Sequence, residues 1–189
     1  MKLSTFLVLS IWLSTSFAMC AENLTVVSKT IQPREMGPLT YLEIQYGSET
    51  FSLVPPPHLR IQTDAQTATI QFLARTGTFA MSIQFTTNDA RNVLASTDTL
   101  RQYAAPHWPQ AQVLEEFPVF SGSSAGKGMD LGFVLHGSPT RCRAAAIPLS
   151  HGCLNIVFTC SANEFPAAQR IFGSLLTSFQ RIEKPKTSS

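Results

Sequence analysis

A cysteine flanked by histidine is the feature of this sequence with the clearest chemical potential. Residues 150–155 read Ser-His-Gly-Cys-Leu-Asn, and a second His-Gly pair begins at His136. A neighbouring base or cation makes a thiolate available near neutral pH, and the thiolate is the nucleophilic form of cysteine. In this interpretation Cys153 is the nucleophile, His151 is the histidine beside it, and His136 is the upstream histidine. The pattern predicts nucleophilic catalysis if the fold brings these side chains together.

This local pattern resembles the active site of cysteine L,D-transpeptidases, and the resemblance implies attack of Cys153 on a carbonyl of a peptidoglycan stem peptide. Two parts of that family's pattern are missing, the upstream Thr-Pro segment and the Gly-Asp or Gly-Thr strand after the last helix. If residues 140–149 form a strand, about 3.3 Å per residue places His136 and Cys153 roughly 25–30 Å apart. We therefore predict a protein that is not an enzyme and keep the cysteine L,D-transpeptidase as the alternative.

The same region reads by periodicity as an antiparallel meander closed by a helix. Alternating apolar residues predict strands over 129–135, 140–149 and 153–160, and apolar residues at helical spacing predict a helix over 165–179. We predict a two-residue turn at Ser138-Pro139 and a three-residue turn over 150–152, which together set both registers. The helix is expected to cover the more apolar face of this sheet, with Asp130 and Arg143 on the opposite face.

This register leads to a disulfide prediction. It places Cys142 and Cys160 directly opposite each other, and opposed Cα atoms in an antiparallel pair are about 4.5–5.5 Å apart, within disulfide range. Disulfides are expected in an exported chain. The alternatives are two buried free thiols, or a bridge between Cys20 and Cys153.

The upstream half predicts more strands and one further helix. Alternation is clearest over residues 79–86, and it also appears over 42–46 and 69–72. An apolar stripe over 88–104 predicts a helix that ends at Pro106. A strand near 112–120 and a flexible Gly- and Ser-rich connection over 121–128 complete the order.

The run from Met129 to Phe179 resembles the C-terminal half of PsbP-like domains. The matching features are the arginine-containing strand with Arg141 and Arg143, the following strand ending at residues 157–161, and the helix ending Leu-Thr-Ser-Phe. The resemblance implies one α/β domain over 24–182 with an α+β fold, an antiparallel sheet with helices packed on it. It implies a non-catalytic accessory or binding protein of the cell envelope that needs no cofactor and takes a protein or small-molecule ligand.

The first 18 residues are typical of a secretory signal peptide. Lys2 is followed by an apolar run, and small residues stand at Ser16 and Ala18. We therefore expect export to the periplasm or the extracellular space, no transmembrane segment in the mature chain, and a disordered tail over 183–189. Cys20 could be lipidated, paired or removed. A net charge of +2 without a basic cluster argues against nucleic acid as a partner, and metal-ligand spacing is not seen.

Overall fold

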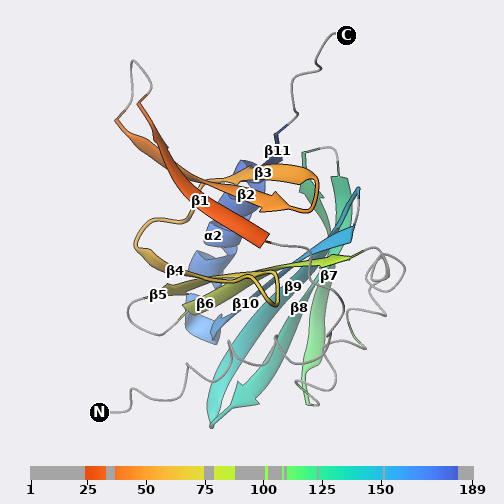
Figure 1. The fold of residues 1–189 in the computed structure, drawn as a ribbon. Coiled ribbons are helices and arrows are strands. Elements are labelled where there is room, and N and C mark those ends of the chain that lie inside the picture. The colour runs from red at the N-terminus through yellow and green to blue at the C-terminus, as the bar shows by residue number, and fades with distance from the viewer. Residues whose placement is uncertain are drawn as a thin grey trace, which may run out of the picture.

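Two antiparallel sheets and one α-helix make up the described part of the chain (Figure 1). The computed structural model describes residues 24–32, 37–74, 79–87, 101, 108, 110–122, 124–150 and 152–182. The smaller sheet has the order β1-β2-β3-β11, formed by Leu24–Ile31, Leu39–Tyr46, Glu49–Leu53 and Gln180–Arg181. The larger sheet has the order β4-β5-β6-β10-β9-β8-β7, formed by Leu59–Asp64, Thr69–Ala74, Phe79–Thr87, Gly152–Ser161, Ser138–Leu149, Ser124–Leu135 and Gln112–Ser121. A 3-10 turn, η4 (Ala162–Glu164), leads into α2 (Phe165–Ser178).

The predicted α+β class, with several helices packed on a sheet, is wrong. Strands dominate, and α2 is the one α-helix whose full length lies in the part of the chain that the structure describes. Of the helix expected over 88–104, Arg101 is described and is helical, and the other residues lie outside the described ones. The stretch over 121–128 was predicted to be a flexible connection, but most of it is strand, because β8 already begins at Ser124. There a Cβ on Gly126 would come 2.1 Å from the carbonyl oxygen of Ala146, so glycine permits close approach of β8 to β9.

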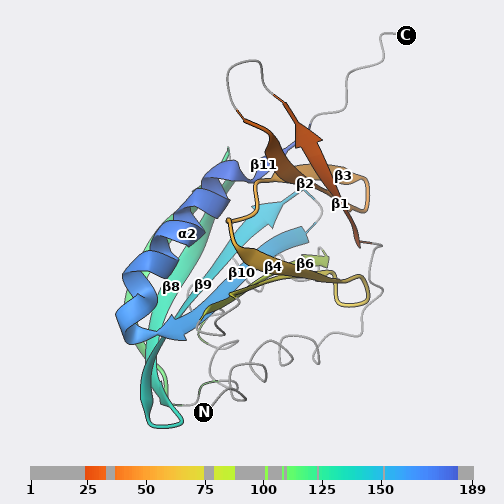
Figure 2. The same cartoon turned by 90° about the vertical axis from the view of Figure 1, so that its left-hand side faces the viewer.

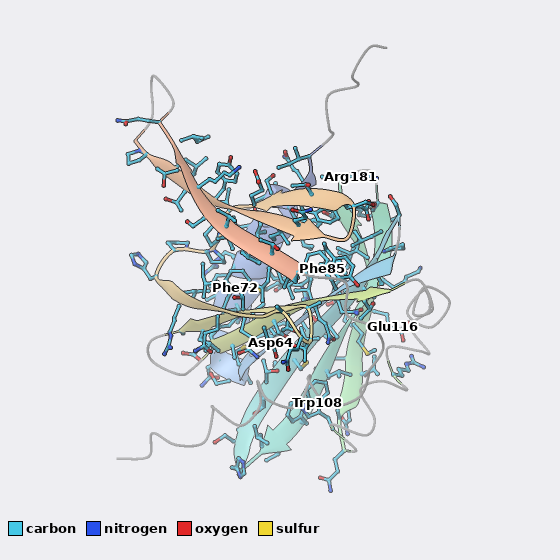
Figure 3. All side chains as sticks on the ribbon, viewed as in Figure 1. Asp64, Phe72, Phe85, Trp108, Glu116 and Arg181 are labelled. Carbon is cyan, nitrogen blue, oxygen red and sulfur yellow. The ribbon has the colours of Figure 1, made fainter. Side chains whose placement is uncertain are left out.

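The main core lies between the larger sheet, the smaller sheet and α2 (Figure 2). The alternation predicted for β6 is confirmed, because Phe79, Met81, Ile83 and Phe85 are all buried in this core. Phe85 lies between the two sheets (Figure 3), with its ring centroid 5.1 Å from that of Tyr46. The smaller sheet and α2 therefore share one face of the larger sheet.

A second apolar cluster occupies the opposite face of the larger sheet. Trp108 packs against it (Figure 3), stacked on Phe133 with 5.6 Å between ring centroids. The buried members are Met129, Leu131, Cys142, Ala144, Ala146, Cys153 and Val157. Strands β9 and β10 are thus buried on both faces.

Both predicted hairpin registers are wrong. Leu135 pairs with Ser138, so the first turn is His136-Gly137, with φ of 50° and 78°. Positive φ at both central residues is the requirement of a type I′ turn, which matches the twist of the strands. In the second hairpin Leu149 pairs with Gly152, which leaves two residues in the turn where three were expected. A register slip of one residue exchanges the two faces of a strand, so the face assignment of β10 relative to β9 is reversed.

Helix α2 covers the face of the larger sheet that carries Arg143, and its buried residues are Ala168, Phe172, Leu175 and Leu176. The apolar stripe predicted for this helix is therefore confirmed at Ala168, Phe172 and Leu175. Just before this helix, Ser161 donates to the Glu164 carboxylate at 3.0 Å, but its side chain makes no capping bond to the helix backbone.

We expect Gly173→Ala to stabilise the protein. Gly173 lies in the interior of α2, it is exposed, and a Cβ there would meet no atom within 4 Å. Alanine loses less backbone entropy than glycine on entering a helix, which is worth about 0.5–1 kcal/mol. Urea unfolding followed by circular dichroism measures the change. The matched variant Gly126→Ala should destabilise the protein, because its Cβ meets backbone. Equal effects in both variants would contradict this account.

Candidate functional site

The structure separates the residues of the predicted cysteine site. His136 lies in the turn that precedes β9, whereas Cys153 pairs with Pro148 near the end of β9. Ten residues at about 3.3 Å each place these positions roughly 30 Å apart, well beyond hydrogen-bond reach. His151 lies outside the described residues. The first His-Gly pair, His136-Gly137, is therefore a hairpin turn.

The surroundings of Cys153 favour its neutral thiol. The residue is 3% exposed, and its Sγ lies 3.7 Å from Oδ1 of Asn155. Burial raises the pKa of the Cys153 thiol from 9.0 to about 12. Nucleophilic cysteines need the opposite shift, toward a stable thiolate near neutral pH. The geometry around Cys153 therefore gives no support to nucleophilic catalysis.

The predicted Cys142–Cys160 disulfide is not formed, and Cys142, Cys153 and Cys160 are free. Its basis, the register of β9 and β10, is wrong: Cys142 pairs with Thr159, and Cys160 pairs with Arg141. Successive side chains of a strand point to opposite faces. Cys142 consequently joins the cluster on the far face, while Cys160 joins the main core. Cys20 lies outside the described residues.

The free thiols predict a loss of stability at high pH. Burial raises the pKa of Cys142, Cys153 and Cys160 from 9.0 to about 12 each. The folded state therefore holds these protons more tightly than the unfolded state, so their contribution is complete below about pH 9 and is lost as the pH rises toward 12. We expect the free energy of unfolding, measured in urea from pH 8 to 11, to fall above pH 9. Cys142→Ala should fall less steeply, and identical slopes would contradict this assignment.

An open pocket of about 470 Å³ lies where the start of α2 meets strands β7, β8 and β9. Its size is within the range of small-molecule sites. The lining residues combine charged, amide and apolar side chains: Leu114, Glu115, Asp130, Arg141, Ala162, Phe165, Pro166 and Gln169. This pocket is the candidate functional site.

One lining residue, Asp130, belongs to a buried ion pair with Arg143. Nε of Arg143 donates to Oδ1 of Asp130, and Nη2 donates to Oδ2, both at 2.6 Å. The two side chains are 8% and 4% exposed. Directly opposed positions on β9 and β8 bring the residues together. Such a two-pronged arginine–carboxylate pair has a fixed geometry and is stronger than a bond between neutral groups.

Aromatic rings and one amide hold the Arg143 guanidinium in place. Its Cζ lies 4.2 Å from the ring centroid of Phe117 and 5.5 Å from those of Phe165 and Phe172. The Gln169 amide, oriented to satisfy its hydrogen bonds, accepts through Oε1 from Nη1 and Nη2 of Arg143 at 3.2 and 2.9 Å. The ion pair thus links the sheet to α2, and it fixes one wall of the pocket.

The sequence held a partial signal for this site. Asp130 and Arg143 were predicted to share one face of the sheet, which is correct, but that face was expected to lie away from the helix. Gln169 and Glu115 were not predicted to belong to any site. An aspartate and an arginine facing each other across two otherwise apolar strands could have indicated a buried pair.

No group of three or more His, Cys, Asp or Glu side chains is placed to hold a metal ion in the ranges that the structure describes. Within those same ranges, no helix has the length and apolar character needed to cross a membrane.

Comparison with known proteins defines the fold. No protein-family model matches the chain, and no curated protein matches its sequence. Among solved structures, it is similar to the cyanobacterial PsbP protein (CyanoP) of Synechocystis sp. PCC 6803, with a TM-score of 0.51 and 10% identity over 89% of this chain and 98% of that one. LpqN, involved in cell envelope biogenesis of Mycobacterium tuberculosis, gives a TM-score of 0.46 and 10% identity over 84% of this chain and 92% of that one.

The likeness to CyanoP supports a PsbP-like fold, as the sequence resemblance implied. At 10% identity it shows the fold alone. The fold hosts the pocket, but function has to be argued from the residues of the site.

Proposed function

We propose that this chain is a non-catalytic, exported accessory protein of the cell envelope that binds a small ligand in the pocket beneath the start of α2. The observation that carries the proposal is the pocket itself, with its buried Arg143–Asp130 pair. A charged pair removed from water costs desolvation energy, and fixed polar groups at one end of an open pocket orient a ligand.

We propose a non-catalytic role because neither Cys153 nor Asp130 is placed to react. Cys153 is buried with a raised pKa, about 30 Å along β9 from His136. Both carboxylate oxygens of Asp130 are engaged, because each accepts a hydrogen bond from the Arg143 guanidinium. Export is proposed from the N-terminal residues 1–18, which have the charge and apolar pattern of a signal peptide.

A defined panel of small molecules tests the binding site. Acetate, ethylammonium, glucose and the dipeptide leucyl-leucine represent an anion, a cation, a neutral polar compound and a dipolar compound. We expect at least one to shift the amide resonances of Arg141 and Gln169 in two-dimensional NMR and to be recovered unchanged. Ala162→Trp, which fills the pocket, should abolish those shifts, whereas Ala167→Trp, on the exposed face of α2, should preserve them.

Two results would contradict the proposal. Shifts confined to other parts of the protein, or shifts equally strong in Ala162→Trp, would place binding outside the pocket. Conversion of a panel member to a new compound would make the protein an enzyme.

A further inference from the structure

We propose that the pocket binds a dipolar ligand, a short peptide whose free carboxylate contacts Arg141 and whose free ammonium group contacts Glu115. This inference rests on the proposed function, because it assigns a ligand class to the same pocket. It goes further by using two charged side chains of the pocket, those of Arg141 and Glu115, that form no ion pair among the described residues.

Arg141 is the available cation of the pocket. Its guanidinium lies over the Phe165 ring, 5.6 Å from the centroid, and it has no hydrogen bond or ion pair with any residue that the structure describes. Arg143, two residues along the same strand face, is instead bonded to both Asp130 and Gln169. Stacking on a ring holds a guanidinium in one plane, and a planar guanidinium binds a carboxylate through two parallel hydrogen bonds.

Glu115 is the available anion. It lines the pocket from β7, opposite Asp130 on β8, and in the described part of the chain it has no ion pair. The adjacent Glu116 is different, because it forms an ion pair with Arg101. Asp130 cannot serve as the free anion, since the Arg143 guanidinium neutralises its charge.

These charges together select the ligand class. A simple anion would meet Glu115 as well as Arg141, and a simple cation would meet Arg141 as well as Glu115, so each would face a like charge. A ligand with both charges satisfies both side chains. Leu114, Phe165 and Pro166 add apolar surface for the part of the ligand between its charged groups.

The strand register indicates the span of the ligand. Glu115 pairs with Asp130, and Arg141 pairs with Gly132, two residues further along β8. Strands about 4.8 Å apart with about 3.3 Å per residue place the two Cα atoms roughly 12 Å apart. Between them the Leu114 side chain lies over Gly132, where a Cβ would come 2.8 Å from its Cδ1, so glycine gives this apolar side chain room in the floor. A dipeptide or tripeptide, at up to about 3.5 Å per residue, is short enough to lie between two positions at that distance.

The test combines blocked peptides with two variants. Calorimetry measures binding of leucyl-leucine, its N-acetyl form and its C-terminal amide to the wild-type protein, to Arg141→Gln and to Glu115→Gln. Loss of one charge-assisted contact should weaken binding by roughly tenfold or more. In the wild type, each block should therefore weaken binding by this factor. Amidation should cost nothing further in Arg141→Gln, and acetylation should cost nothing further in Glu115→Gln. The exposed Arg170→Gln should behave as the wild type.

Several results would overturn the inference. These are equal binding of blocked and free peptides, acetate binding as tightly as leucyl-leucine, or full sensitivity to amidation in Arg141→Gln. A Lys-Leu-Glu peptide that is blocked at both ends carries its charges on side chains, as a segment of a protein would. If it binds as tightly as leucyl-leucine, the pocket does not require free termini, and the inference is also overturned. If leucyl-leucine fails while glucose or another panel member shifts the pocket resonances, this inference fails and the proposed function stands.

Discussion

Asp130→Ala is expected to destabilise the folded protein by about 3–5 kcal/mol, the range found when one member of a buried ion pair is removed. The reason is the group that remains. Arg143 stays under α2 among three aromatic rings, with the Gln169 amide as its remaining side-chain hydrogen-bond partner among the described residues. A buried cation without a counter-ion has lost its water and gained nothing equivalent. Urea unfolding at pH 7 measures the change.

Removing both charges separates this cause from simple loss of contacts. Asp130→Leu combined with Arg143→Met replaces the pair by apolar side chains of similar volume, which is often neutral or stabilising. We expect the double variant to recover most of the stability lost in Asp130→Ala. Lys29→Met, which breaks the exposed pair with Glu43, should leave the urea midpoint unchanged within error. A double variant as unstable as the single one would show that the charge on Arg143 is not the cause.

The ion pair also connects stability to binding. Asp130 and Gln169 both line the pocket, and both bond to Arg143. The pocket wall is therefore a by-product of the contact that fixes α2 on the sheet. Side chains that are already fixed lose little conformational freedom when a ligand binds, so binding at this wall requires little reorganisation of the protein.

Strands could be predicted where one face of the sheet differs chemically from the other. In β6, apolar residues alternate with Ala80, Ser82 and Gln84, so the buried face follows directly from the sequence. The register of β9 and β10 could not be predicted in the same way. Residues 144–147 are all apolar and all buried, because both faces of β9 are covered. A slip of one residue then exchanges one apolar face for another, so the residue pattern does not distinguish the correct register from the slipped one.

Turn chemistry misled the sequence analysis for a related reason. The His136-Gly137 pair matched part of a catalytic motif, and the turn was predicted at Ser138-Pro139. In the structure Pro139 pairs with Val134 inside the ladder, at the end of the hairpin. His136 adopts a positive φ, which is uncommon for a residue other than glycine and is not visible in a residue pattern.

The pocket could not be predicted because it depends on that same register. Arg141 and Arg143 lie under α2 only when β9 presents its odd-numbered residues to the helix. The predicted register turned the even-numbered residues of β9 toward the helix, so Arg141 and Arg143 were expected on the face away from it. The sequence motif pointed to His136, His151 and Cys153 as reactive residues. Which residues share a pocket depends instead on how the strands and α2 pack, and the motif does not contain that information.

Phe158→Ala is expected to destabilise the protein by about 3–5 kcal/mol, the usual range for truncating a buried phenylalanine. Phe158 has no exposed surface and lies on β10, in the middle of the main core. Its ring centroid is 5.8 Å from that of Phe79, 5.6 Å from that of Phe165 and 5.7 Å from that of Phe172. Truncation removes contacts with the sheet and with α2 together, and rigid neighbours cannot collapse into the space.

A matched phenylalanine provides the control. Phe120 lies on β7 with 65% of its surface exposed, so Phe120→Ala should change the free energy of unfolding by no more than about 0.5 kcal/mol. Urea unfolding measures both variants, and the helical signal of α2 should be lost in the same transition as the sheet. Phe158 also packs on Phe165, which stacks on both Arg141 and Arg143. Partial folding of Phe158→Ala should therefore weaken ligand binding at the pocket, whereas Phe120→Ala should bind as the wild type. Equal destabilisation by the two substitutions would show that the core is not centred on Phe158.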